Sequence, residues 1–300
     1  MTSPADQNAS SRPRRSCLYM PADKPRVLEK GKTLPADAII FDLEDAVAPE
    51  AKDAARTGAQ VAVSEGGYGA RETIIRINGL DTDWGLDDIK AAVSAGPNGI
   101  LAPKVIGGED IDRLNDAMTS VGAPDTMALW VMIEMPKAIL NIQEIGEAAG
   151  RTRLKGFVMG TNDLAKEYRA IATPDRLAFQ TAFGMTLAAA RAYDLIAIDG
   201  VYNDIQNVDG LRAECEQGRT LGFDGKTLIH PAQIDTANTV FSPAEDDVAQ
   251  ARDVIAAFAE PENAGKGVIK VNGKMTELLH LEEAKRIVDV AEAIAAMAET

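Results

Sequence analysis

Short apolar runs rich in β-branched residues alternate along most of the chain with longer stretches in which apolar residues recur every three or four positions. Short continuous apolar runs are typical of strands buried on both faces of a parallel sheet, and the wider spacing is typical of amphipathic helices. The runs predicted as strands are 17–20, 38–43, 73–77, 99–102, 128–133, 156–159, 195–198 and 223–229. The stretches predicted as helices include 24–32, 49–64, 109–120, 136–149, 174–193 and 208–221.

These alternating units predict an α/β fold in which parallel strands are joined by helices. Eight units between residues 14 and 260 fit a closed (β/α)8 TIM barrel better than an open, doubly wound sheet. Residues 1–13 are polar and have no apolar segment, so we expect a flexible N-terminal tail rather than a secretion signal.

The last part of the chain breaks the alternation. Residues 268–275 alternate around Asn272-Gly273, a strong signal for a type I′ hairpin, and an alanine-rich helical pattern follows over 281–297. We therefore predict that residues 261–300 add a hairpin-plus-helix lid, which also serves oligomerisation.

Composition narrows the class of protein. Hydrophobic residues make up 46% of the 300 residues, and the net charge of −15 argues against nucleic acid or an anionic membrane as a partner. No apolar run approaches the roughly 20 residues needed to cross a bilayer. Cys17 and Cys215 are expected to be free thiols in a reducing cytoplasm.

Charged or titratable side chains follow seven consecutive predicted strands. They are Glu44-Asp45, Arg76, Lys104, Glu134, Asp163, Asp199 and His230. Barrel enzymes carry their catalytic groups at the carboxyl ends of the strands, so these side chains are expected to converge on one mouth. A solvated loop or a helix cap explains any single one of them equally well, and Asp163 in particular could cap the next helix.

The chemistry open to this set is limited. The sequence contains no Gly-rich phosphate loop, no HExxH zinc motif and only two histidines, His230 and His280. Lys104 is the best candidate for a Schiff base, and it is a weak one. Glu134 and Asp163 at adjacent strand ends predict a site for a hard cation, and Arg76 could bind a carboxylate or carbonyl oxygen bidentately.

At this point the sequence resembles, along nearly its whole length, the citrate lyase β-subunit-like acyl-CoA lyases of the HpcH/HpaI aldolase superfamily. Malyl-CoA lyases and malyl-CoA thioesterases are the most similar members. The matching segments are Arg15-Ser-Cys-Leu-Tyr-Met-Pro, Phe41-Asp-Leu-Glu-Asp-Ala-Val, Ile75-Arg-Ile-Asn-Gly, Ala102-Pro-Lys-Val, Met132-Ile-Glu, Met159-Gly-Thr-Asn-Asp-Leu-Ala-Lys-Glu and Gly222-Phe-Asp-Gly-Lys-Thr-Leu-Ile-His-Pro.

The resemblance implies roles for the residues at the strand ends. Glu134 and Asp163 match the carboxylates that hold Mg²⁺, with Mn²⁺ as an alternative, and Arg76 matches the arginine at the reacting carbonyl. Glu44 and Asp45 match the acidic pair behind that arginine. The expected substrate and CoA-binding surface comprises Tyr19, Pro21, Lys24, Arg76, Lys104, His230 and Pro231.

The implied reaction joins or cleaves a carbon–carbon bond in a short hydroxyacyl-CoA, for example malyl-CoA to glyoxylate and acetyl-CoA. A malyl-CoA thioesterase of the same fold remains open, as does a citrate lyase β subunit. An aldolase acting on free hydroxy-keto acids is disfavoured by the C-terminal extension, and a non-catalytic binding protein by the competent side chains at every expected position. Acyl-CoA and α-keto acid are the expected partners.

The resemblance also assigns a catalytic carboxylate to the lid. The family places an aspartate shortly after a Gly-x-Met segment, whereas here Gly273-Lys274-Met275-Thr276 is followed by Glu277, which is one methylene longer. The family further implies a homotrimer or homohexamer. The helical pattern over 281–297 presents an apolar face suited to such an interface.

Overall fold

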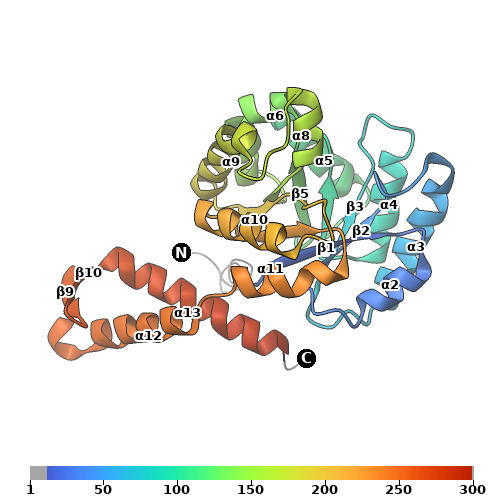
Figure 1. The fold of residues 1–300 in the computed structure, drawn as a ribbon. Helices are drawn as coiled ribbons and strands as arrows, with labels where there is room; N and C mark the ends of the chain where they lie inside the picture. Colours follow the sequence, from blue (N-terminus) through green and yellow to red (C-terminus); the bar gives the residue numbers. More distant parts are fainter. Residues whose placement is uncertain (1–11, 299–300) are drawn as a thin grey trace. The chain divides into compact units, whose positions relative to one another are not determined.

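In the computed structural model, which describes residues 12 to 298, eight parallel strands close into a barrel (Figure 1). The predicted tail over 1–13 lies almost entirely outside the described residues. The strands are β1 (Ser16–Pro21), β2 (Ala38–Asp42), β3 (Glu72–Arg76), β4 (Gly99–Ala102), β5 (Ala128–Ile133), β6 (Leu154–Met159), β7 (Ile196–Asp199) and β8 (Gly225–Leu228). The predicted TIM barrel is confirmed, and β1 pairs with β8 to complete it.

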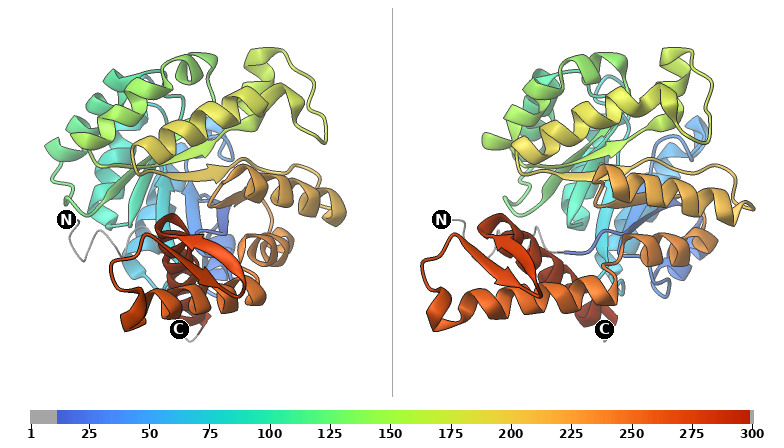
Figure 2. Two further views of the ribbon diagram at one scale, coloured as in Figure 1. Left: turned by 90° about the vertical axis from the view of Figure 1, so that its left-hand side faces the viewer. Right: turned by 60° about the vertical axis from the view of Figure 1, so that its left-hand side comes forward.

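Helices surround the strands on the outside of the barrel (Figure 2). They are α2 (Pro25–Gly31), α3 (Lys52–Glu65), α4 (Gly85–Ala95), α5 (Gly108–Ser120), α6 (Pro136–Leu140), α7 (Ile142–Glu147), α8 (Thr161–Tyr168), α9 (Gln180–Ala192), α10 (Val208–Leu221) and α11 (Ile234–Phe241). Short 3₁₀ turns are η1 (Pro49–Ala51), η2 (Ala148–Gly150), η3 (Leu177–Phe179) and η4 (Pro231–Gln233).

The strands bury both of their faces in two separate apolar clusters. Ile40, Ile74 and Ile198 belong to the smaller cluster that fills the barrel, whereas Phe41 and Ile75 belong to the larger cluster between strands and helices. Because side chains alternate along a strand, these residues fix which strand-end side chains turn into the barrel and which turn toward the helices.

Two predicted helices differ from the structure for local reasons. The stretch over 136–149 is interrupted at Asn141, whose side-chain amide donates to the carbonyl of Ile106 at 2.8 Å. The stretch over 174–193 becomes helical only after Arg176, which has a φ of 51° in the left-handed region. Both interruptions depend on backbone geometry that hydrophobic spacing does not report.

A second compact unit follows the barrel. The barrel unit spans Arg14–Phe241, so the expected boundary at residue 260 differs from the observed division at Ser242. The C-terminal unit contains α12 (Glu245–Ala259), η5 (Pro261–Asn263), β9 (Val268–Val271), β10 (Lys274–Glu277) and α13 (Leu278–Ala298). Asn272 and Gly273 have φ values of 48° and 83°, as a type I′ turn requires, so the predicted hairpin is confirmed.

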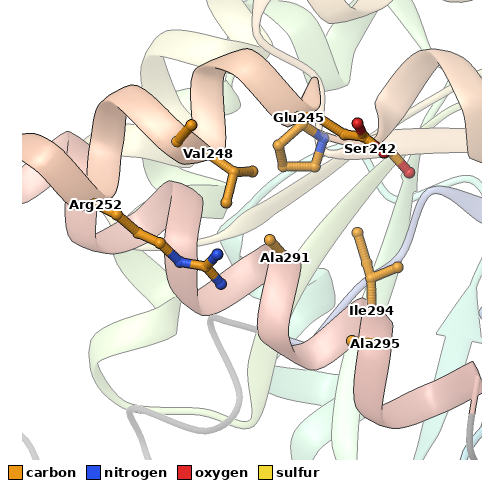
Figure 3. A pocket seen from close by; sticks show the side chains of 9 residues that line it. Ser242, Glu245, Val248, Arg252, Ala291, Ile294 and Ala295 are labelled. Carbon is orange, nitrogen blue, oxygen red and sulfur yellow. The ribbon is translucent and has the colours of Figure 1, made fainter.

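The apolar face of α13 has two parts. Its first half, including Ala284 and Ile287, packs with α12 and the hairpin in an apolar cluster of the C-terminal unit. Its second half, with Ala291 and Ile294, lines an open pocket of about 420 Å³ together with residues of α12 such as Val248 (Figure 3). Part of the predicted interface face is therefore already covered within this unit.

Two further sequence-based expectations concern thiols and membranes. Cys17 and Cys215 are both free and buried. Among residues 12 to 298, no helix is both long enough and apolar enough to span a bilayer.

Candidate active site

The C-terminal end of β3 carries Arg76, a largely buried arginine that is 7% exposed. In the parallel register Arg76 lies opposite Asp42 of β2. Its Nε donates to Oδ1 of Asp42 at 2.7 Å and its Nη2 donates to Oδ2 at 2.6 Å. The bidentate edge of the guanidinium is therefore occupied by Asp42 rather than open to a ligand. Sequence reasoning missed Asp42, whose signal is its position directly across the strand pair from Arg76.

The remaining side of the guanidinium faces the acidic pair predicted beside it. Nη1 of Arg76 lies 3.1 Å from Oε2 of Glu44 and 3.7 Å from Oδ2 of Asp45. The guanidinium carbon lies 4.6 Å from the ring centroid of Tyr19. Burial disfavours the charged guanidinium, but the negative charge of Asp42 outweighs it and the pKa of Arg76 stays well above its ordinary value. The arginine is thus a permanent, fixed positive charge at this mouth.

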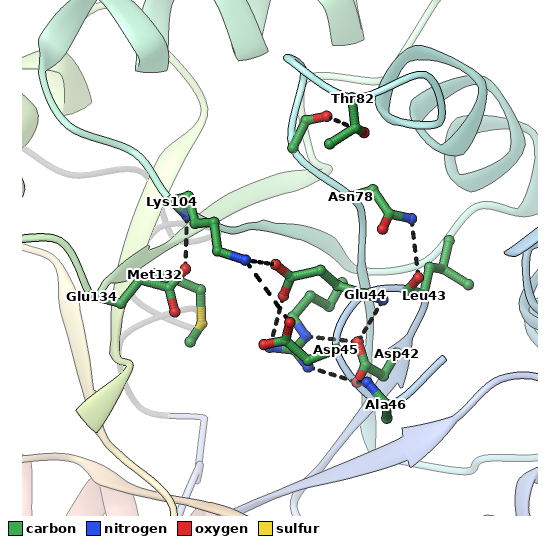
Figure 4. A network of polar contacts seen from close by, with 12 residues as sticks. Asp42, Leu43, Glu44, Asp45, Ala46, Asn78, Thr82, Lys104, Met132 and Glu134 are labelled. Carbon is green, nitrogen blue, oxygen red and sulfur yellow. Dashed lines mark hydrogen bonds and ion pairs between the residues drawn. The ribbon is translucent and has the colours of Figure 1, made fainter. Parts of the chain in front are cut away.

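Lys104 joins the two acidic parts of the site (Figure 4). Its Nζ donates to Oε1 of Glu44 at 2.6 Å, and its backbone N–H donates to Oε1 of Glu134 at 2.8 Å. Burial lowers the pKa of Lys104, but the hydrogen bond and charge of Glu44 outweigh burial and raise the pKa above its ordinary value. A Schiff-base lysine needs the opposite shift, so the structure argues against that role.

Glu134 follows β5 and is 1% exposed. Its Oε2 is buried and has no hydrogen-bond partner among the described residues. Burial and the charges of Glu44 and Asp163 raise the pKa of Glu134 to about 8, against the lowering effect of the Lys104 N–H and of Arg76. A buried acceptor without a donor in an acidic neighbourhood is the surrounding that a bound cation would complete.

Space beside Glu134 is kept by a glycine. A Cβ placed on Gly160 would lie 2.4 Å from both Cβ and Oε2 of Glu134, a separation that real side chains do not tolerate. Gly160 is the N-cap residue of α8, and Asp163 stands in the first turn of that helix. Within the described part of the chain, no hydrogen bond from Asp163 caps α8, so the capping alternative is not supported.

Two carboxylates are the protein ligands that Mg²⁺ commonly takes, with water and substrate oxygens filling its other positions. Among the described residues, no group of three or more His, Cys, Asp or Glu side chains could hold a metal ion. Two carboxylates of this kind suit a hard cation, whereas a closed structural zinc site takes four protein ligands, mostly Cys and His.

The other predicted binding residues lie at the ends of β1 and β8. Tyr19 and Pro21 belong to β1, and Lys24 is the exposed residue before α2. His230 is the N-cap residue of η4 and Pro231 its first residue, and Nδ1 of His230 accepts the N–H of Ala232 at 3.2 Å. Tyr19 contacts the charged cluster through Arg76, Pro21 lies opposite Asp42 in the β1–β2 register, and the Tyr19 hydroxyl lies 3.5 Å from Sδ of Met132.

Glu277 belongs to the C-terminal unit and is described there. It is the last residue of β10, is exposed, and donates its backbone N–H to Nδ1 of His280 at 3.0 Å. A side chain reaching back to the backbone at the start of a helix resembles the capping box, so the backbone of Glu277 has a defined position in its unit.

One strand-end residue does not face the mouth as predicted. Asp199 turns toward the helices and accepts Nη1 of Arg176 at 2.7 Å and Nζ of Lys226 at 3.2 Å. Lys226 also donates to Oε1 of Glu214 at 2.6 Å. Because its neighbour Ile198 faces the barrel interior, alternation along β7 sends Asp199 outward. Asp199 therefore belongs to a buried ion network that joins β7, β8 and α10.

We expect this network to act on stability rather than on catalysis. Asp199→Ala should lower the free energy of unfolding by about 3–5 kcal/mol, because the buried cations Arg176 and Lys226 would then share the single carboxylate of Glu214. Urea unfolding followed by circular dichroism measures the change, with Asp116→Ala on the surface of α5 as the control. An unchanged unfolding midpoint would contradict this assignment.

A closed (β/α)8 barrel with a charged cluster at the carboxyl ends of its strands is the arrangement typical of barrel enzymes. The chain belongs to the HpcH/HpaI aldolase/citrate lyase family, whose model matches residues 15–231. It is 50% identical over 284 residues to a (3S)-malyl-CoA thioesterase from Cereibacter sphaeroides, covering 95% of this chain and 96% of that protein. It is 33% identical over 297 residues to a citrate lyase subunit beta from Escherichia coli, covering 97% and 98%.

Solved structures agree with this family. CitE from Mycobacterium tuberculosis in complex with magnesium, acetoacetate and coenzyme A is 25% identical with a TM-score of 0.72, covering 92% of this chain and 97% of that chain. RipC from Yersinia pestis is 29% identical with a TM-score of 0.66, covering 80% of this chain and 99% of that chain. The predicted family and its fold are thereby confirmed.

Proposed function

We propose that this protein is a magnesium-dependent enzyme that acts on short hydroxyacyl-CoA esters, and that its net reaction is hydrolysis of (3S)-malyl-CoA. The structural observation that carries the proposal is the buried, unpartnered Oε2 of Glu134 beside Asp163 and the fixed charges of Arg76 and Lys104. The 50% identical relative named as a (3S)-malyl-CoA thioesterase supports the choice of substrate and bond.

Glu134 and Asp163 would hold Mg²⁺, which when bound offsets negative charge on the oxygens of the substrate. The Glu134 carboxylate is oriented by the Lys104 N–H at Oε1, and its Oε2 accepts no hydrogen bond from residues 12 to 298. CitE, bound to magnesium, acetoacetate and coenzyme A, supports this pairing of a metal with a small acid and CoA.

The hydrolytic reaction needs water at the thioester carbonyl. The oxygen of water forms a bond to the carbonyl carbon, the carbon–sulfur bond breaks, and the proton released by water is balanced by protonation of the CoA thiolate, giving malate and CoA. Arg76 is held in place by Asp42, and Lys104 by Glu44. Their fixed positive charges stabilise negative charge that develops on the substrate oxygen.

A second candidate reaction breaks a carbon–carbon bond instead. Malyl-CoA would lose its hydroxyl proton, the bond between the hydroxyl-bearing carbon and the adjacent methylene would break, and protonation of that methylene carbon would give glyoxylate and acetyl-CoA. The family description and the exposed Glu277 at the end of the lid hairpin favour this reaction. Glu277 would then supply the proton.

Product analysis decides between the two. The protein is incubated with (3S)-malyl-CoA and Mg²⁺, and free thiol, malate, glyoxylate and acetyl-CoA are quantified over time. Equal amounts of malate and free CoA support hydrolysis, whereas glyoxylate and acetyl-CoA without free thiol support carbon–carbon cleavage. Turnover of neither kind, with citryl-CoA and other hydroxyacyl-CoA esters also inert, would overturn the proposal.

We predict separately that the protein forms a homotrimer or homohexamer and that the Glu277 carboxylate acts in the active site of a neighbouring subunit. Glu277→Gln should abolish proton exchange at the methyl group of acetyl-CoA, and Glu277→Asp should retain part of it. Mixing Glu277→Gln with Asp163→Asn subunits should restore activity, because one site can then combine an intact part from each chain. Absence of rescue after proven subunit mixing, or a monomer by light scattering, would contradict the shared site.

A further inference from the structure

A buried ammonium group lies outside the set of side chains assigned to the reaction. Lys52 is the first residue of α3, is 7% exposed, and forms no ion pair with a carboxylate within residues 12 to 298. Its Nζ donates to the carbonyl of Leu43 at 2.8 Å and to the carbonyl of Glu44 at 2.7 Å. The same Nζ lies 5.5 Å from the ring centroid of Trp84. The direct contacts of Nζ are thus two backbone oxygens and an aromatic face, and the carboxylates of Asp42, Glu44, Asp88 and Asp45 act on its charge from farther away.

Two effects oppose a charge at this position and outweigh the favourable charges of the nearby carboxylates. Burial is the largest influence on Lys52 and lowers its pKa. The beginning of a helix also disfavours a cation, because the helix dipole is positive there. An apolar side chain of similar volume would avoid both costs and would often be as stable or more stable. What Lys52 provides, and an apolar residue would not, is a pair of strong donors to the loop after β2.

That loop carries Glu44, whose backbone is fixed on both sides. The N–H of Glu44 donates to Oδ1 of Asp42 at 2.9 Å, and its carbonyl accepts from Lys52. The preceding carbonyl, of Leu43, accepts from Lys52 and also from Nδ2 of Asn78 at 3.0 Å (Figure 4). Neither Asp42 nor Lys52 hydrogen-bonds the Glu44 carboxylate, which is therefore left to face Arg76 and Lys104.

We infer that Lys52 is a positioning residue: its buried ammonium fixes the Leu43 and Glu44 carbonyls and thereby holds the Glu44 carboxylate between Arg76 and Lys104. The inference rests on the proposed function only for its catalytic consequence. The geometric consequence, a rigid loop after β2, is independent of which substrate the enzyme takes.

The test compares Lys52→Met, which keeps the length and removes the donors, with Lys52→Arg, which keeps charge and donors. Lys90→Met on the exposed face of α4 is the matched control. Hydrogen exchange of the amides within residues 41–48 is measured by mass spectrometry, together with kcat and KM for the CoA ester that the wild type turns over. Lys52→Met should accelerate exchange of the Glu44 and Ala46 amides by about tenfold or more, because hydrogen bonds from charged donors are lost.

The same variant should lower kcat by about tenfold with KM nearly unchanged, Lys52→Arg should restore most of both values, and Lys90→Met should match the wild type. Wild-type exchange or wild-type kcat in a folded Lys52→Met protein would overturn the inference. If Lys52→Met does not fold, Lys52→Gln replaces it, with faster exchange expected and wild-type exchange again contrary. A wild type without CoA-ester turnover would refute the proposed function, and the exchange measurement would still decide the role of Lys52.

Discussion

Replacing Glu134 with Gln should stabilise the metal-free protein at pH 9, leave it nearly unchanged at pH 5, and abolish its response to magnesium. In the folded state the pKa of Glu134 is raised from 4.5 to about 8, first by burial and then by Glu44 and Asp163. Between these values the folded state binds a proton that the unfolded state has lost, so stability falls as pH rises across this window. The full loss, present above pH 8, is on the order of 3–5 kcal/mol.

Magnesium should restore the stability that the wild type loses at high pH when Glu134 ionises. Binding requires the ionised carboxylate, so affinity should rise with pH toward about 8 and binding should release protons. Gln keeps an oxygen for the Lys104 N–H but removes the charge, and activity should fall by more than roughly 100-fold. Thermal unfolding at pH 5 and pH 9 with and without Mg²⁺ measures these effects, with Glu109→Gln on the exposed face of α5 as the control. A variant that still gains stability from Mg²⁺ would show that the cation binds elsewhere.

Arg76→Lys should reduce kcat by about 10²–10³, nearly as much as Arg76→Ala. A lysine ammonium cannot reproduce the two parallel hydrogen bonds to Asp42 while also facing Glu44. Asp42→Asn should share part of the defect, because it removes the charge that holds the guanidinium in place. A fall in kcat in both the Arg76 and the Asp42 variants would distinguish an arginine held in place by Asp42 from one that moves freely to meet its ligand.

Steady-state kinetics of these variants, with circular dichroism to establish folding, makes the measurement. Arg113→Lys is a suitable control, because Arg113 is exposed on α5 and makes only a 3.6 Å ion pair with Asp110. Retention of most activity by Arg76→Lys would mean that a point charge is sufficient and that the planar geometry is irrelevant.

The barrel could be predicted from the sequence, because the apolar runs are short and the stretches between them show clear helical spacing. It was less informative about side-chain direction. Asp42 lies within the apolar run that predicts the second strand, and only the strand register shows that it stands beside Arg76. Asp199 was expected at the mouth, although the inward Ile198 before it requires the opposite direction. Successive side chains of a strand point alternately into the barrel and toward the helices. This alternation decides which strand-end residues reach the site, and the spacing of apolar runs along the sequence does not show where the alternation starts.

The Lys52 contacts were beyond prediction for a different reason. They depend on a side chain from α3 meeting two carbonyls of the loop after β2, and neither partner has a distinctive sequence pattern. By contrast, Glu134 and Asp163 were predictable because each directly follows its strand, where the fold concentrates functional groups. The sequence did not show that Glu134 is buried near Glu44 and Asp163, and it is these surroundings that raise its pKa.

The narrow gap between Gly160 and Glu134 has an evolutionary consequence. Any side chain at position 160 would overlap the present rotamer of Glu134, so the two positions cannot drift independently. Because the overlap includes Cβ of Glu134, a change of rotamer would not relieve it, and a lineage that lost the glycine would have to shift the backbone that carries this residue. Family members with a bulkier residue at this position should accordingly have a displaced or missing carboxylate, so this pair of positions separates members that keep the acidic pocket from those that have taken the same barrel to another use.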